Sequence, residues 1–352
     1  MIVTKGRLDE VRQVTAFLVQ KPQDRLQIFE FLAALGEGLR NTLSSLTLAN
    51  PDAGLDRVFS AAMESAIDGS SPPSVRAQAI RLISVSSLSF ADASDWLVLL
   101  CNPQPWLDVR SAAVATVAHY DDPGAVVGLL DRWRTFPPVL RNQAVASLLS
   151  RRSHVPAVLE AVEKSRLSVA DFSSAQLNFL RTYPDAQVSE RANRLFGPLT
   201  VHRPGVMDLF RPALRLTGVR DRGQATFSAQ CAGCHQASQG GQRLGPNLAE
   251  MRPRGKEQLL EAIIEPNARV SEQYATSVVQ TGDGDNLVGI KSDDNLSSLT
   301  LRQPGGEGVV CPRLNVRSVR TESWSLMPEG LEQGLSTQDM ADLLAFLITA
   351  TP

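Results

Sequence analysis

Apolar residues recur at helical spacing in one segment after another, from residue 7 to about residue 200. Apolar positions at i, i+3, i+4 and i+7 are typical of an amphipathic α-helix. Turn-forming pairs such as Asn50-Pro51, Pro72-Pro73, Asp122-Pro123 and Pro137-Pro138 interrupt the pattern. The N-terminal part is therefore predicted to be a series of helices, over residues 8–20, 25–40, 56–67, 74–87, 109–120, 140–150 and 155–165.

Three of these expected helices share a local pattern. Arg76, Arg110 and Arg141 lie 34 and 31 residues apart, and each is followed three positions later by an alanine. Such a period, with a small residue where two helices must approach closely, is typical of a solenoid of helical pairs. The pattern resembles HEAT-type repeats, and an irregular all-α domain is the alternative. We expect residues 1–200 to act as a scaffold or interaction surface.

The character of the sequence changes near residue 198. A proline-containing segment over residues 201–218 is interpreted as a connector with a short amphipathic helix, and residues 219–352 as a second domain. Within it, residues of about 272–322 alternate β-favouring side chains with Asp-Gly and Gly-Gly turns, which predicts a small antiparallel sheet. The fold class is therefore mainly α, with a β insertion in the second domain.

The most specific motif is Cys231-Ala232-Gly233-Cys234-His235. It holds two of the four cysteines and one of the four histidines in five positions. Cys-x-x-Cys-His is the attachment sequence for c-type haem, in which two thiols add to the vinyl groups and the histidine becomes an axial iron ligand. We expect one covalently bound haem c on Cys231 and Cys234, with His235 on the iron.

Two other uses of these residues stay open. A zinc site could combine the motif with the distant Cys311, although the adjacent Cys234 and His235 rarely reach two corners of one tetrahedron. A redox dithiol of the thioredoxin kind would need a preceding strand and a βαβ unit, and neither is expected here. If haem takes two thiols, Cys311 could be a buried thiol or pair with Cys101.

A haem site makes further demands on the chain. The Nδ1–H of the axial histidine needs a fixed acceptor, and the carbonyl of Pro246 in the segment Gly245-Pro246-Asn247-Leu248 is a plausible partner. A sixth ligand is commonly methionine. Met327, flanked by Pro328 and Gly330 on an expected loop, is the best candidate, because the other methionines lie in the N-terminal part, the connector or expected apolar helix faces.

The ends of the second domain are predicted to be two packed helices. Gly223 and Phe227 lie on one face of a helix within residues 221–235, and a capping pattern from Ser336 to Asp339 opens a helix over residues 336–350. Gly223 would allow Phe346 of the last helix to approach closely. Arg243, Arg252, Arg254 and Trp324 are near enough in sequence to contact haem propionates.

From about residue 205 onward the chain resembles the haem-binding domain of planctomycete and verrucomicrobial proteins. Cys-x-x-Cys-His is followed in order by "GPNL", a helix ending in "EPNARV", a tyrosine-led β insertion, "SLMP" and a helix ending in "LAFL". The resemblance implies covalent haem c, axial His235 and Met327, and an electron-transfer role. It also places Gly245, Pro246 and Asn247 among the cofactor-binding residues.

The resemblance further implies an exported protein, often joined to propeller-like dehydrogenase domains. Thioether attachment requires export, so we expect a periplasmic or other extracytoplasmic location. No signal peptide or propeller is visible in the sequence, which suggests a fragment or a separately exported subunit. No apolar run approaches the roughly 18 residues of a membrane span, so none is expected.

Two classes of function are weighed. The favoured one is a mono-haem electron carrier between a partner dehydrogenase and a later acceptor, with the helical repeats as docking scaffold and no catalytic residue of its own. The alternative is a haem-based peroxidase-like enzyme or a sensor, with an open sixth iron position. With 35 basic and 37 acidic residues, the chain offers no electrostatic case for nucleic acid as a partner.

Overall fold

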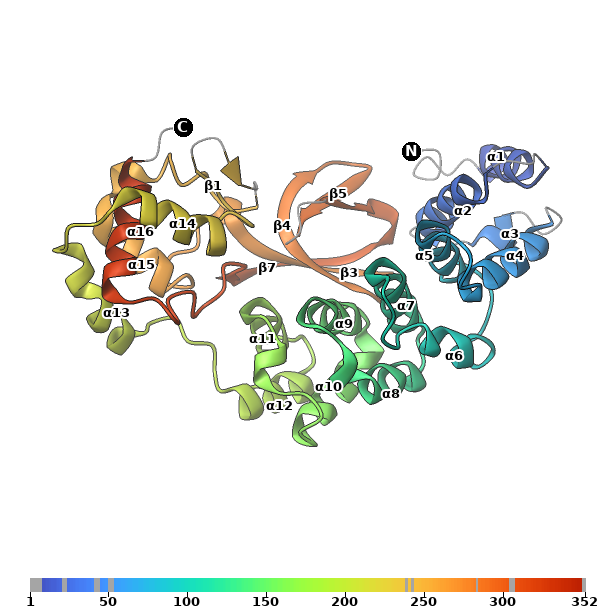
Figure 1. Cartoon of the computed structure of the whole chain (residues 1–352), viewed down its shortest axis with the longest axis horizontal. Coiled ribbons are helices and arrows are strands. Elements are labelled where there is room, and N and C mark those ends of the chain that lie inside the picture. Colours follow the sequence, from blue (N-terminus) through green and yellow to red (C-terminus); the bar gives the residue numbers. More distant parts are fainter. Residues whose placement is uncertain are drawn as a thin grey trace. The chain divides into compact units, whose positions relative to one another are not determined.

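The computed structural model describes residues 8–20, 24–40, 45–49, 54–237, 240–241, 244–282, 284–303 and 308–349. The chain is mostly helical with a small antiparallel sheet (Figure 1), as the sequence predicts. It divides into two compact units. The first is Met1–Phe172 with Gln280–Asn286 and Pro312–Arg317, and the second is Ser173–Val279 with Leu287–Cys311 and Ser318–Pro352.

Several helices of the first unit begin at prolines that interrupt the pattern of the sequence. Pro73, Pro123 and Pro138 each occupy the first turn of a helix, where a missing N–H costs nothing. The α-helices are α1 (Leu8–Gln20), α2 (Arg25–Arg40), α3 (Leu46–Ala49), α4 (Leu55–Ile67), α5 (Pro73–Ile83), α6 (Phe90–Leu99), α7 (Leu107–His119), α8 (Pro123–Asp131), α9 (Pro138–Ser150) and α10 (Val155–Glu163).

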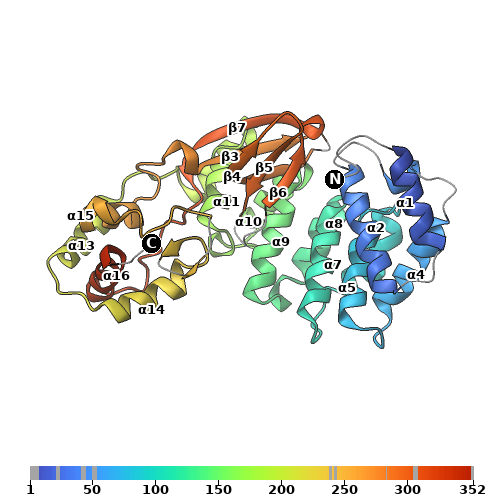
Figure 2. The same ribbon diagram turned by 90° about the horizontal axis from the view of Figure 1, so that it is seen from above.

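Helices α5, α7 and α9 lie side by side (Figures 1 and 2), with α7 packed on both of its neighbours. Their aligned arginines make the same contact. Nε of Arg76, Arg110 and Arg141 donates to a backbone carbonyl near the end of the preceding helical segment, at 3.0 to 3.2 Å. The alanine three positions after each arginine is fully buried. The sequence alignment of these helices therefore has a structural counterpart.

The second unit holds the remaining helices and most of the sheet. The α-helices are α11 (Ser174–Arg181), α12 (Ala186–Phe196), α13 (Pro204–Phe210), α14 (Arg220–Gln230), α15 (Gly255–Ile264) and α16 (Thr337–Thr349). A five-stranded sheet has the order β6-β5-β4-β3-β7, with β3 (Ala275–Thr281), β4 (Asn286–Asp294), β5 (Ser298–Arg302), β6 (Gly308–Pro312) and β7 (Val316–Ser325). A short pair, β1 (Gln236–Ala237) and β2 (Gly240–Gly241), precedes it.

The compact units depart from the boundaries expected from the sequence. Helices α11 and α12, which fall within the bounds of 1–200 expected for the repeats, lie in the second unit. The indole N–H of Trp324 donates to the Thr182 hydroxyl at 3.2 Å, and the Glu329 N–H donates to the Ser174 hydroxyl at 3.2 Å. The expected connector contains α13, whose Phe210 belongs to the buried core of the second unit.

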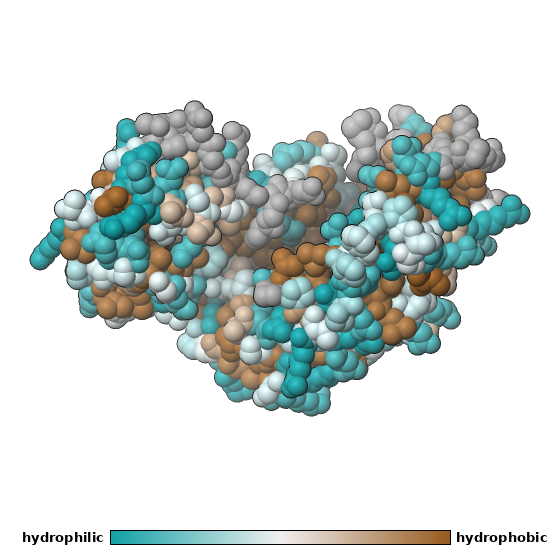
Figure 3. Space-filling model, in the orientation of Figure 1, coloured by the Kyte–Doolittle hydropathy of each residue, from teal (hydrophilic) through white to brown (hydrophobic). Residues whose placement is uncertain are grey.

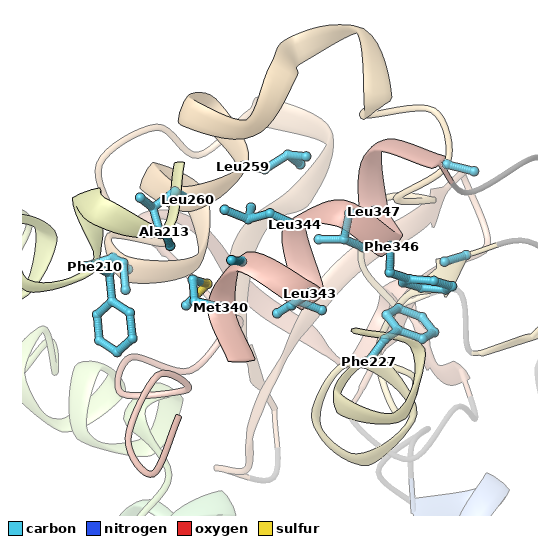
Figure 4. Close-up of a cluster of buried hydrophobic side chains, with 14 residues drawn as sticks. Phe210, Ala213, Phe227, Leu259, Leu260, Met340, Leu343, Leu344, Phe346 and Leu347 are labelled. Carbon is cyan, nitrogen blue, oxygen red and sulfur yellow. The ribbon is translucent and has the colours of Figure 1, made fainter. Parts of the chain in front are cut away.

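The apolar core of the second unit surrounds α16 (Figure 4). Met340, Leu343, Leu344 and Leu347 lie on the buried face of that helix, in the stripe that the sequence predicts. The expected capping pattern is also present, since the Asp339 N–H donates to the Ser336 hydroxyl at 3.1 Å. The core therefore forms around the last helix of the chain.

Helices α14 and α16 pack with their backbones in close contact. A Cβ at Gly223 would lie 2.0 Å from the Asp342 carbonyl oxygen and 2.9 Å from the Phe346 Cβ. This confirms the close approach expected at Gly223. The rings of Phe227 and Phe346 lie 5.3 Å apart, and Figure 4 shows them facing each other between the two helices. Helix α14 is thereby fixed where its last turn leads into the cysteine motif.

Candidate haem-binding site

The cysteine motif forms a tight turn at the end of α14. The Cys231 N–H completes the helix by donating to the Phe227 carbonyl at 2.8 Å. The Cys231 carbonyl then accepts the N–H groups of Cys234 at 3.0 Å and His235 at 2.9 Å. The turn therefore holds both thiols and the imidazole within one short, hydrogen-bonded segment.

Both thiols of the motif are half-buried, and neither forms a disulfide. Burial raises the pKa of Cys231 to about 11, with a smaller contribution from the neighbouring Cys234, and burial also raises the pKa of Cys234. Cys231 packs against the apolar core. At neutral pH the site therefore presents two reduced, protonated thiols at the edge of that core.

The imidazole of His235 is buried and oriented by one hydrogen bond. Its Nδ1 lies 2.8 Å from the Pro246 carbonyl oxygen, the contact expected from the sequence. A carbonyl can only accept, so Nδ1 carries the proton and Nε2 has a free lone pair. Burial lowers the pKa of His235, and the bond to Pro246 offsets only part of this decrease. Burial therefore keeps the ring neutral.

The segment Leu244–Leu248 lies along the motif and fixes this geometry. The Gly245 N–H donates to the Cys234 carbonyl at 2.8 Å, and the Leu248 N–H donates to the Gln236 carbonyl at 2.7 Å. A Cβ at Gly245 would lie only 2.4 Å from Cε1 of His235. A glycine is therefore needed here, because the imidazole packs directly on the backbone.

Asn247 stabilises the turn that follows this segment. Its side-chain oxygen accepts the Ala249 N–H at 3.1 Å. Asn247 is thus placed beside the site as expected, but its side chain serves the backbone. Arg243, the other residue expected in this stretch, lies outside the described residues.

Residues 221–300 match the family model of cytochrome c. The match includes the cysteine motif and the segment that holds His235, and it supports a c-type cytochrome haem-binding domain. Such a domain implies covalently bound haem c and supports a haem-based electron-transfer protein. A search of curated proteins finds no significant match.

The residues in the stretch that matches this family model fit a covalently bound haem. Two reduced thiols stand three positions apart, and a neutral imidazole offers an unprotonated Nε2, which is the form that binds iron. The two alternatives from the sequence lack this support. Among the described residues, no three His, Cys, Asp or Glu side chains gather as a zinc site would require. A redox dithiol would need a lowered thiol pKa, whereas both pKa values are raised.

Cys101 and Cys311 contribute nothing to the site. Both side chains are buried, Cys101 in the first unit and Cys311 in the second. Burial raises the pKa of Cys101 to about 12.

Met327 lies in the segment between β7 and α16, residues 326–336, which we call the Met327 loop. Its side chain is half-buried, and its N–H donates to the Ser325 hydroxyl at 3.1 Å. By contrast, Met207, Met251 and Met340 pack in or against the apolar core. Among the described methionines of the second unit, Met327 is therefore the one that does not pack in or against this core.

Trp324 is fully buried beside this loop. Its indole N–H has a protein partner in Thr182, so the expected contact with a haem propionate would require that bond to be exchanged. Sequence reasoning missed Asp342, whose buried carboxylate accepts the Val219 N–H at 2.7 Å and Nε of Arg222 at 2.7 Å. A charged residue inside the apolar stripe of the last helix was the available signal.

No described helix is both long enough and apolar enough to cross a membrane. Figure 3 shows hydrophilic and hydrophobic residues mixed over the face in view.

Proposed function

We propose that residues 219–352 form a mono-haem c-type cytochrome domain that carries single electrons. The observation that supports this most directly is the bond between Nδ1 of His235 and the Pro246 carbonyl, next to two reduced thiols. Cys231 and Cys234 would hold the haem through thioether bonds, with His235 and Met327 as axial ligands. The bound iron would exchange one electron between its ferric and ferrous states.

The protein's own residues would set the conditions for that exchange. Pro246 fixes the orientation and tautomer of the His235 ring, which makes Nε2 the ligating atom. Gly245 leaves the ring room to lie on the backbone. A thioether ligand from Met327 favours the ferrous state and so raises the reduction potential. Gly245, Pro246 and Met327 would therefore tune the site without reacting themselves.

The wider setting follows from the resemblance to planctomycete and verrucomicrobial haem-binding domains. We propose a periplasmic or other extracytoplasmic location, where thioether attachment is completed. The partner would be a dehydrogenase domain or subunit that delivers electrons. HEAT-like helical repeats in the first unit would dock this partner. The repeated arginine contacts of α5, α7 and α9 support the repeats themselves.

The first test is a haem stain of the denatured full chain, produced with export and a cytochrome c maturation system. We expect covalent haem and a low-spin reduced spectrum. The double variant Cys231→Ala/Cys234→Ala should be colourless after denaturation, whereas Cys101→Ala, which removes a buried thiol of the first unit, should keep its haem. Haem lost on denaturation of the unsubstituted chain would refute the proposal, and rapid carbon monoxide binding would indicate an open sixth position.

A further inference from the structure

One buried side chain holds the Met327 loop from both sides. Asn267 follows the end of α15 and is 6% exposed. Its Oδ1 accepts the Ser325 N–H at 2.9 Å, and its Nδ2 donates to Oε1 of Glu329 at 2.5 Å. These partners stand two residues before and two residues after Met327. A single amide group therefore joins the two ends of the short segment that carries the methionine.

Other contacts of the same compact unit support this segment. The Met327 N–H donates to the Ser325 hydroxyl at 3.1 Å, and the Glu329 N–H donates to the Ser174 hydroxyl at 3.2 Å. Farther along the loop, Arg203 binds both carboxylate oxygens of Glu332, at 2.7 and 3.1 Å. Both side chains of that pair are largely buried, at 17% and 5% exposed. The loop is thus fixed at several points by residues far away in sequence.

We propose that Asn267 is a positioning residue that keeps the Met327 loop in one conformation and so stabilises methionine as the sixth ligand. The inference rests on the proposed role of Met327. Asn267 itself would not touch the haem. An axial ligand carried on a loop is lost when the loop opens, so the free energy that keeps the loop closed adds directly to the stability of ligation. Removing Asn267 would leave the Ser325 N–H and the Glu329 carboxylate without their buried partner.

The first test measures the loop itself by amide hydrogen exchange in the haem-loaded full chain. In Asn267→Ala, exchange across residues 325–329 should become at least about tenfold faster. The matched control is Asn193→Ala in α12, which also removes a hydrogen-bonded amide, here one that donates to the Arg181 and Ser189 carbonyls. It should leave exchange in the loop unchanged. Equal exchange in Asn267→Ala and the unsubstituted protein would overturn the inference.

The second test measures ligation. Asn267→Ala should weaken the near-infrared band that marks methionine on ferric haem and raise the affinity for added imidazole by about tenfold or more. Asn267→Asp should do the same, because it places a carboxylate against Glu329. Adding Glu329→Gln should restore the band, since the new amide can donate to the new carboxylate with the net charge conserved. A swap that restores nothing, or single variants that change nothing, would contradict the positioning role.

The result for Met327→Ala separates this inference from the proposed function. If Met327→Ala leaves the band and the imidazole affinity unchanged, Met327 is not the ligand and the proposed ligation is wrong. If Met327→Ala removes the band while Asn267→Ala keeps it, ligation by Met327 stands and the role given to Asn267 is wrong.

Discussion

At the scale of the residue, the site depends on how closely backbone and imidazole can pack. The bond from His235 to Pro246 is what a haem-binding histidine would need, so the sequence alone indicates it. The sequence alone does not indicate the need for glycine at position 245, because this need arises only when the Gly245 backbone lies against the ring. The structure thus adds a steric requirement to an expected hydrogen bond.

This requirement gives the first prediction. In Gly245→Ala the new Cβ would lie 2.4 Å from Cε1 and 2.7 Å from Nδ1 of His235, so the ring must turn and its bond to Pro246 weakens. We expect unfolding of the haem-loaded protein to become easier by about 1–3 kcal/mol, measured in denaturant. Gly233→Ala, in the same motif, meets nothing within 4 Å and should change little. Equal effects of the two substitutions would show that packing on His235 is unimportant.

At the scale of the element, local patterns predict many of the helices but not all of their partners. The first and last helices of the second domain, the cap at Ser336 and the contact at Gly223 are all visible in the sequence, because each depends on residues within one or two turns. The place of α11 and α12 in the second unit is not visible in the sequence. It depends on hydrogen bonds between residues that lie 142 and 155 positions apart in the chain. A local sequence pattern cannot predict hydrogen bonds between residues so far apart.

The crossing of α14 and α16 gives the second prediction. A Cβ at Gly223 would meet the Asp342 backbone, which no side-chain rotation can relieve. We expect Gly223→Ala to destabilise the protein by about 2–3 kcal/mol, measured by denaturant unfolding. The control is Gly205→Ala in α13, where a Cβ meets nothing within 4 Å, so the better helix propensity of alanine should leave stability equal or slightly higher. A tolerated alanine at Gly223 would mean that the helices do not pack this closely.

At the scale of the whole molecule, the net charge is close to zero, and carboxylates with lowered pKa values contribute to how stability responds to pH. Burial alone would raise the pKa of Asp342, but its hydrogen bonds with Arg222, Val219 and Gln338 outweigh this and lower it. Glu265 behaves alike, because the bonds from His202 and the Arg203 N–H outweigh its burial and lower its pKa. Both residues belong to the second unit, so acid should weaken that unit.

The sign of this effect follows from proton binding. A carboxylate with a lowered pKa in the folded protein binds a proton more readily in the unfolded chain, so its stabilisation is complete above the unfolded pKa of about 4. The stabilisation is then lost as the pH falls through the folded pKa. We therefore expect Asp342→Asn to cost about 2 kcal/mol at pH 7 and progressively less as the pH is lowered below about 4.

The measurement is the free energy of unfolding of both proteins in denaturant between about pH 3 and pH 7. Asp221→Asn on α14 is the matched control, since its side chain is 91% exposed and pairs only loosely with Arg220 at 3.8 Å. Its effect should be small and nearly independent of pH. If the Asp342→Asn difference stays constant down to pH 3, the charge of Asp342 contributes nothing, and the loss comes from hydrogen bonds to donors that an amide NH2 group cannot accept.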